Sequence, residues 1–361
     1  MMIKKKVIIA AGGTGGHLLP AQEIAKKLQE KGIEVLFVGS GLKENVYFDR
    51  KSFKFHEILA KTPFQKGVTR CLGALYALLK AVARSCFFLK IFKPDLIIGF
   101  GSFHAFPILC AAKLQKKPFM LFESNTVAGK VTRFFSSFAT HTAIHLPLAK
   151  KIKGNLIEVS WPLRAKEPNL SQAKAREQLQ LEPNRFTLLI FGGSQGASAI
   201  NHAVLSICEQ LLAKEIPFQI IHLVGRSTSV EVEQFCKRHN IPAFIKTFEK
   251  NMSRVFYAAD LALCRSGAAT IAEIIHYQMP AILIPYPYAT EQHQRENALF
   301  LQRLSAAYVI EEGSDMQRLI LEFLDTFTKN PEVGEQMRVS LQNLKSKKKE
   351  MSDLIIEALN V

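Results

Sequence analysis

The chain has 361 residues, of which 48% are hydrophobic and 22% are charged. This balance is typical of globular proteins and excludes a mainly disordered chain, and the length predicts two domains of ordinary size. The net charge of +16 favours anionic partners. Nucleic acid, anionic lipid and phosphorylated substrates all fit that charge, which does not choose among them.

The start of the chain predicts a cytoplasmic protein without a leader. Its basic residues run directly into the short apolar segment Val7–Ala10, which is too brief for a signal-peptide core. The longest apolar stretch, Leu96–Ala112, is interrupted by glycine and proline, so no membrane span is expected. No two of the six cysteines form a CxxC pair, which favours reduced thiols over disulfides or a zinc site.

Short runs of Val, Ile, Leu and Phe alternate with longer helix-like stretches, the pattern of βαβ units around a parallel sheet. The predicted strands are 7–10, 35–38, 96–99, 119–122, 186–191, 219–224 and 261–264. The alternation restarts near Phe186, which predicts two similar α/β domains. Residues 160–164, with the polar sequence that follows to Pro183, are expected to link the domains beside a ligand cleft.

The first glycine-rich turn, Gly12–His17, follows a predicted strand and opens a predicted helix. Glycine lets the backbone approach a ligand closely, and a helix N-terminus offers unpaired N–H groups, so we expect this turn to bind phosphate. It matches neither the dinucleotide-binding fingerprint nor a P-loop. A tight turn that only packs helix on strand is the alternative.

The second turn, Gly192–Ala197, contains G-x-S-x-G after a strand, so a serine hydrolase is a rival interpretation. Ser194 would be its nucleophile, with Asp260 and either His276 or His293 following in the required order. The first half of the chain has a sister turn without serine, and no oxyanion segment of the HGGG type is present. Both observations weigh against the hydrolase.

The third turn, Arg265–Thr270, follows the predicted strand 261–264 and opens a helix that carries Glu273. Small residues at a helix N-terminus suit a second phosphate, and a carboxylate further along could accept hydrogen bonds from ribose hydroxyls. A solvated helix face is the alternative for Glu273. Because the chain has no Asp-x-Asp pair and no cluster at metal-ligand spacing, we expect no dedicated metal and no other cofactor.

These turns, together with the His293-Gln294 and Asn297-Ala298 pairs, resemble the MurG family in order and spacing over essentially the whole chain. The resemblance implies an inverting glycosyltransferase that moves N-acetylglucosamine from UDP-N-acetylglucosamine to lipid I, the undecaprenyl-diphosphate muramoyl peptide, to form lipid II in peptidoglycan synthesis. It implies an α/β fold of the GT-B type, with two Rossmann-like domains facing a central cleft. Residues 1–163 would bind the acceptor and the membrane, 164–344 would bind the UDP-sugar, and a helix at about 345–361 would pack back on the first domain.

The resemblance also implies the site residues. The substrate-binding residues would be Thr14, Gly15, Gly16, Asn125, Arg164, Ser194, Gln195, Arg265, Ser266, Gly267, Ala268, Glu273, His293 and Gln294. Two departures affect the acceptor side. Residues 122–125 read Phe-Glu-Ser-Asn where the family commonly has His-Glu-Gln-Asn, and residues 99–104 lack the usual Gly-Gly-Tyr.

Sugar transfer needs a base for the acceptor hydroxyl and stabilisation of the departing nucleotide diphosphate. We hypothesise a direct inverting displacement with His17 as the catalytic base, because a histidine beside a helix N-terminus is biased towards its neutral form. A structural or phosphate-contacting cap is the alternative role for His17.

Helical spacing of apolar residues from Leu72 to Leu89, with Lys80, Arg84 and Lys90 among them, predicts a basic amphipathic helix at an anionic lipid surface. A buried helix is the alternative. The family implies a peripheral protein on the cytoplasmic face of the inner membrane, with contacts to other cell-wall synthesis or division proteins. No nucleic-acid motif is present, so nucleic acid is not an expected partner. An epimerase and a glycosyltransferase with another lipid acceptor share the fold and remain rivals.

Overall fold

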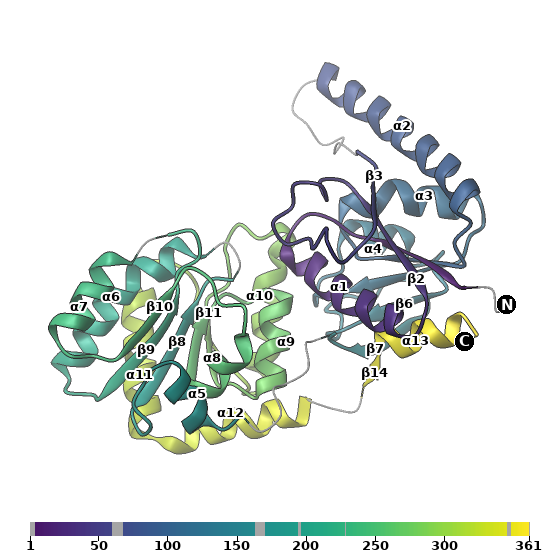
Figure 1. Cartoon of the computed structure of the whole chain (residues 1–361). Helices are drawn as coiled ribbons and strands as arrows, with labels where there is room; N and C mark the ends of the chain where they lie inside the picture. The colour runs from purple at the N-terminus through teal and green to yellow at the C-terminus, as the bar shows by residue number, and fades with distance from the viewer. Residues whose placement is uncertain are drawn as a thin grey trace. The chain divides into compact units, whose positions relative to one another are not determined.

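The structure is a computed structural model that describes residues 4–59, 68–162, 170–193, 196–227, 229–344 and 348–360, with side chains left out for 68–71. The chain divides into two compact units. Unit 1 comprises Met1–Arg164 with Lys347–Val361, and unit 2 comprises Ala165–Ser346. Each unit is an α/β sheet structure, as predicted (Figure 1).

Unit 1 is built on a parallel sheet in the order β14-β7-β6-β5-β4-β1-β2-β3. Its strands are β1 (Lys6–Ala10), β2 (Glu34–Gly39), β3 (Phe55–Glu57), β4 (Leu96–Gly99), β5 (Phe119–Glu123), β6 (His141–Ile144), β7 (Leu156–Ser160) and β14 (Lys349–Glu350). Its helices are α1 (Gly15–Glu30), α2 (Val68–Phe92), the short η1 (Phe103–Ala105), α3 (Phe106–Leu114), α4 (Lys130–Phe135) and α13 (Met351–Ala358). The C-terminal helix α13 contacts α1, and Lys27 of α1 pairs with Glu350 at 2.5 Å.

Unit 2 has a parallel sheet in the order β10-β9-β8-β11-β12-β13. Its strands are β8 (Phe186–Phe191), β9 (Phe218–Leu223), β10 (Ala243–Lys246), β11 (Leu261–Cys264), β12 (Ala281–Leu283) and β13 (Tyr308–Val309). Its helices are α5 (Gln172–Gln178), α6 (Ser198–Ala213), α7 (Val230–Arg238), α8 (Met252–Ala258), α9 (Ala268–Tyr277), η2 (Thr290–Gln292), α10 (His293–Arg303), α11 (Met316–Lys329) and α12 (Pro331–Leu344).

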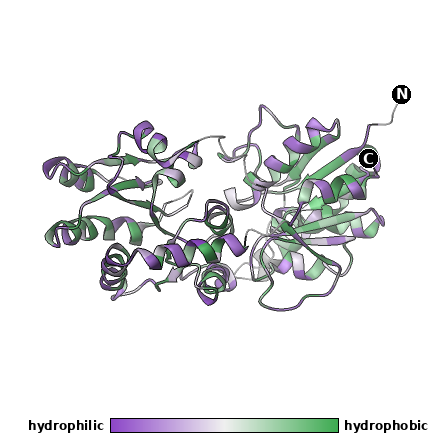
Figure 2. Ribbon diagram, turned by 90° about the horizontal axis from the view of Figure 1, so that it is seen from below, coloured by the Kyte–Doolittle hydropathy of each residue, from purple (hydrophilic) through white to green (hydrophobic). Residues whose placement is uncertain are grey.

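The two sheets repeat one topology. In each, the first strand lies in the middle, with the second and third strands on one side and the later ones on the other, which is the 3-2-1-4-5-6 order of doubly wound nucleotide-binding folds. The central strands are almost entirely buried and hydrophobic, because helices cover both faces of a parallel sheet (Figure 2). The first glycine turns of the two halves therefore occupy equivalent places, after β1 and after β8.

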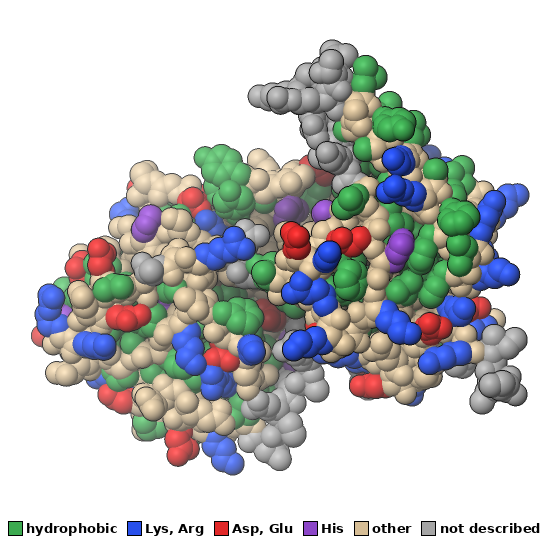
Figure 3. Space-filling view, turned by 45° about the horizontal axis from the view of Figure 1, so that its top comes forward, with side chains coloured by type: hydrophobic (Ala, Val, Ile, Leu, Met, Phe, Trp, Pro, Cys, Tyr) green, Lys and Arg blue, Asp and Glu red, His purple; other side chains and the backbone are tan. Residues whose placement is uncertain are grey.

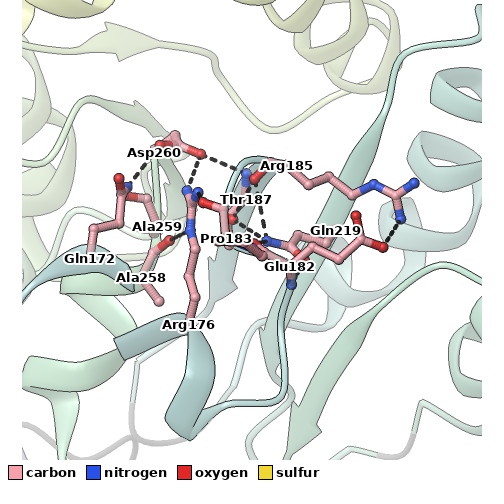
Figure 4. A network of polar contacts seen from close by, with 10 residues as sticks. All are labelled: Gln172, Arg176, Glu182, Pro183, Arg185, Thr187, Gln219, Ala258, Ala259 and Asp260. Carbon is pink, nitrogen blue, oxygen red and sulfur yellow. Dashed lines mark hydrogen bonds and ion pairs between the residues drawn. The ribbon is translucent and has the colours of Figure 1, made fainter. Parts of the chain in front are cut away.

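Part of the polar stretch expected to be a linker belongs instead to the core of unit 2. Helix α5 packs against α8, and the Arg176 side chain is only 4% exposed. Its guanidinium donates to the carbonyls of Pro183 and Ala258 and forms an ion pair with Asp260 at 2.7 Å (Figure 4). Asp260 also accepts from the Thr187 backbone N–H at 2.8 Å. Because of these bonds, α5 is held against the amino-terminal ends of β8 and β11.

We expect Arg176→Ala to lower the free energy of unfolding by about 3 kcal/mol, because it leaves a partly buried carboxylate and two carbonyls without their donor. Arg185→Ala is the matched control, since Arg185 pairs with the exposed Glu182 and its loss should cost less than about 1 kcal/mol. Urea denaturation of both variants measures the difference. Equal effects of the two changes would contradict the role given to Arg176.

Candidate functional site

In unit 1 the predicted residues gather where the strands end. The turn after β1 leads into α1, and Thr14 is the N-cap residue of that helix although its side chain makes no capping hydrogen bond. Gly13 has φ +86°, a conformation that favours glycine. His17 lies in the first turn of α1, with its Nδ1 3.5 Å from Thr14 Oγ1. The N-terminus of α1 thus has no side-chain cap and is suited to an anion.

Asn125 lies at the same edge, after β5, and the buried carboxylate of Glu123 organises its loop. Glu123 accepts hydrogen bonds from the backbone N–H groups of Ser124 and Asn125 through Oε1 and from that of Gly129 through Oε2, at 2.9–3.1 Å. Sequence reasoning did not single out Glu123. The available signal was a carboxylate ending a strand that is otherwise apolar.

In unit 2 the third turn, Arg265–Thr270, is held in place by hydrogen bonds between buried residues. Ser266 is fully buried, and its hydroxyl donates to the Gln294 carbonyl at 2.8 Å. Asn297, also fully buried, donates to the Ser266 carbonyl at 3.1 Å. Gly267 is the N-cap residue of α9 and has no side chain to cap that helix. Residues from α10 therefore hold the turn and leave the α9 N-terminus, which begins at Ala268, open to a ligand.

The Arg265 guanidinium is already engaged inside unit 2. It forms an ion pair with Glu312 at 2.5 Å and donates to the carbonyls of Ile284 and Pro285, both at 3.2 Å. It also lies 5.4 Å from the ring centroid of Tyr286. These bonds make Arg265 a support for the turn from inside unit 2, and its predicted role in substrate binding stays a prediction.

Glu273 is half-buried in the second turn of α9, and no hydrogen-bond partner is found for it among the described residues. Burial raises the pKa of this carboxyl group to about 8. The pKa of the Cys264 thiol is raised mainly by burial and further by the charge of Glu273. Glu273 therefore lies beside the end of β11. A carboxyl group kept without a partner in this way is available to a ligand.

The sugar-side residues lie at the start of α10. His293 Nδ1 is 2.7 Å from the Thr290 carbonyl, which can only accept, so Nδ1 carries a proton and donates it to that carbonyl. Gln294 Oε1 accepts from the Tyr286 N–H at 3.0 Å. Ser194, Gln195 and Arg164 lie outside the described residues.

The serine hydrolase interpretation is wrong. Asp260 precedes β11 and bonds to Thr187 at the start of β8, whereas the glycine turn with Ser194 follows the end of β8. A six-residue strand spans about 20 Å, so this carboxylate cannot orient a histidine beside that turn. Asp260 is tied to Arg176 instead.

No group of three His, Cys, Asp or Glu side chains is placed to hold a metal ion within the described ranges. Free cysteines there are Cys86, Cys110, Cys208, Cys236 and Cys264.

Comparisons with known proteins cover both units. A model of the glycosyltransferase family 28 N-terminal domain matches residues 7–144, and one of the family 28 C-terminal domain matches residues 187–355. A UDP-N-acetylglucosamine–N-acetylmuramyl-(pentapeptide) pyrophosphoryl-undecaprenol N-acetylglucosamine transferase of Protochlamydia amoebophila (strain UWE25) is 41% identical over 304 residues, covering 82% of this chain and 80% of the relative. A transferase of the same name from Chlamydia pneumoniae is 33% identical over 345 residues, covering 94% of each chain.

Solved structures show the same fold. The crystal structure of Acinetobacter baumannii MurG superposes with a TM-score of 0.77 at 24% identity over 99% of each chain. The calicheamicin glycosyltransferase CalG4 gives a TM-score of 0.69 at 14% identity over 99% of each chain. The predicted GT-B fold is therefore confirmed.

We expect Glu273→Gln to stabilise the protein above pH 7. The unfolded carboxyl group loses its proton near pH 4.5 and the folded one near pH 8, so the folded state binds more protons between these values and its stability falls as pH rises through that window. Glutamine removes this dependence, which is worth about 2 kcal/mol at pH 8 for a half-buried group. Thermal melts of both proteins at pH 5 and pH 8 measure it. A variant no more stable than the wild type at pH 8 would contradict the raised pKa.

Proposed function

This chain belongs to the MurG family of family 28 glycosyltransferases, the lipid II synthases that transfer N-acetylglucosamine from UDP-N-acetylglucosamine to lipid I, and we propose which of its residues carry the two substrates. One observation supports the assignment most. In each unit the described residues of the family motifs lie at the carboxyl edge of a parallel sheet, where ligands of such folds bind.

We infer that unit 2 binds the donor. The open N-terminus of α9, formed by Ser266, Gly267 and Ala268, would hold the UDP diphosphate, with Ser194 and Gln195 of the second turn beside it. Glu273 would accept hydrogen bonds from the ribose hydroxyls, and His293 and Gln294 would bind the sugar. Arg265 would act through the turn, because its guanidinium is held by Glu312.

Unit 1 would bind the acceptor. Thr14, Gly15 and Gly16 at the N-terminus of α1 would face the diphosphate of lipid I, and Asn125 would bind nearby on the loop that Glu123 orders. Arg164, outside the described residues, stays a proposed binding residue by its motif alone.

The reaction that these residues support is an inverting displacement at the anomeric carbon of the donor sugar. The acceptor hydroxyl attacks as the bond to the UDP diphosphate breaks, and the N–H groups of α9 stabilise the charge that the departing UDP gains. His17 would take the proton of the attacking hydroxyl, because it lies in the first turn of α1 among the acceptor-binding residues. The two helix N-termini thus serve different substrates.

We expect wild-type protein to move labelled N-acetylglucosamine from its UDP donor onto lipid I, and His17→Ala to lower kcat at least about 100-fold while binding UDP normally, since general-base catalysis contributes factors of that size. Radiolabel in the lipid fraction and calorimetric UDP titration measure the two. Release of free sugar or of an epimer by the wild type would point to another enzyme of the same fold. Near-normal turnover by His17→Ala would leave the histidine a structural cap.

We also propose that unit 1 docks peripherally on the anionic inner leaflet of the membrane through α2. One face of α2 packs on α3 and contains the buried residues Ala74, Leu78, Ala81, Ser85 and Leu89. The opposite face is exposed and apolar, with Leu72, Leu75, Tyr76, Leu79, Phe87 and Ile91. One face of this helix is thus buried, and the proposal of a lipid-facing surface rests on the exposed apolar face.

Basic side chains adjoin this exposed face. Lys80, Arg84 and Lys90 are exposed, and Figure 3 shows basic and hydrophobic side chains interspersed over α2. Of the described helices, the segment Leu72–Phe92 alone is long and apolar enough to cross a membrane. Because its other face is packed against α3, we propose that it lies in the lipid interface and does not span the bilayer.

A basic pocket of about 410 Å³ lies at the end of α3, the helix on which α2 packs. Its lining residues are Lys113, Lys116, Lys117, Pro118, Phe119, Phe138 and Thr140. The Lys113 ammonium lies 3.4 Å from the centroid of the Phe138 ring. None of the three lysines has an acidic partner among the described residues, so the pocket is suited to a lipid phosphate.

We expect the pair of changes Tyr76→Ser and Leu79→Ser to weaken binding to vesicles with anionic lipid at least about tenfold, because two exposed apolar side chains no longer enter the interface. Co-sedimentation measures the bound fraction. Val339→Ser, which removes an exposed apolar side chain from unit 2, is the control and should bind normally. Binding by the wild type that ignored both anionic lipid and salt would contradict the proposed surface.

A further inference from the structure

A hydrogen-bonded serine–histidine pair, Ser40 and His104, lies beside the first glycine turn of unit 1. Ser40 follows β2 and His104 lies in η1 after β4, and both strands pair directly with β1, which leads into the turn. Ser40 Oγ and His104 Nδ1 are 2.6 Å apart. The pair therefore joins the loops on either side of the turn.

The imidazole ring lies directly against the glycines. A Cβ built on Gly12 would lie 2.7 Å from His104 Cβ, and one built on Gly13 would lie 3.2 Å from His104 Nε2. Asn45 holds the same turn by donating to the Gly13 carbonyl at 2.7 Å. The absence of side chains at positions 12 and 13 thus makes room for His104 and brings its Nε2 to the turn.

The partner of Nδ1 decides which ring nitrogen carries the proton. Ser40 is buried, and His104 is the only hydrogen-bond partner found for its hydroxyl among the described residues. A buried hydroxyl hydrogen without an acceptor is costly, so Ser40 donates to Nδ1. Burial lowers the pKa of His104, which keeps the ring neutral at pH 7. The proton is then on Nε2, as a donor facing the turn.

That donor is free to bind a ligand. No partner is found for His104 Nε2 among the described residues, and it is not one of their fully buried unpaired atoms. We propose that His104 is an acceptor-binding residue, positioned by Ser40, whose Nε2–H donates to a phosphate oxygen of the lipid-linked diphosphate at the Gly12–Gly16 turn. This assignment rests on the proposed function, in which that turn binds the acceptor.

The test separates binding from packing. The double variant Ser40→Ala/His104→Phe keeps a ring against the glycines, removes the donor and leaves no orphaned hydroxyl. We expect its KM for lipid I to rise about ten- to hundredfold, as the loss of a hydrogen bond to a charged group predicts, with the KM for UDP-N-acetylglucosamine and the melting temperature unchanged. His104→Gln, whose amide can still donate, should recover part of the loss.

An unchanged KM for lipid I in the double variant would show that the ring only fills space and would overturn the proposal. If the wild type transferred nothing to lipid I, the proposed function would fail instead. Nitrogen-15 NMR of labelled histidine gives a second readout. We expect a Nε2–H tautomer for His104, assigned by its loss in His104→Gln, and a shift of that signal on addition of inorganic diphosphate. A signal moved by lipid I but not by diphosphate would contradict the phosphate contact.

Discussion

Parallel strand pairing is the constraint on which both sites depend. When all strands of a sheet run in one direction, every strand ends at the same edge, and the helices that follow begin there with their unpaired N–H groups. In unit 1 this edge collects the turn before α1, the Ser40 and His104 loops and the Glu123 loop. In unit 2 it collects the turns before α6 and α9. The topology therefore gathers helix N-termini, with their unpaired N–H groups, at one edge of each sheet.

Buried and half-buried polar side chains order these turns. Glu123 binds three backbone N–H groups of its loop, Asn297 binds the carbonyl of Ser266, and Glu312 holds Arg265. Each satisfies groups that a loop at a sheet edge would otherwise leave unpaired. These three side chains can favour ligand binding without touching the ligand, because a turn that is already ordered loses less entropy when a ligand binds.

In unit 2, a polar network at one edge of the sheet stabilises the fold, and the residues proposed to bind the donor lie at the other edge. At the amino-terminal edge, Arg176 and Asp260 form a saturated network that ties α5 and α8 to the strands. At the carboxyl edge, no partner for Glu273 is found in the described part of the chain, and burial raises its pKa. A carboxyl group whose burial destabilises the folded protein at neutral pH, in the helix proposed to bind the diphosphate, is better explained by ligand binding than by folding.

The sequence by itself determined the α/β class, the repeated strand–turn–helix plan and the family, because these follow from apolar runs and from glycines whose spacing is local along the chain. Tertiary structure alone decided the roles of residues whose partners are distant in sequence. Asp260 cannot belong to a hydrolase triad at the second turn, because it lies at the other end of β8. Arg265 supports its turn because Glu312, 47 positions away in the chain, forms an ion pair with it. Likewise, only the pairing of β2 and β4 with β1 brings Ser40 and His104 to the glycine turn. Spacing along one chain cannot show such contacts, since they are made when strands from separate segments meet in one sheet.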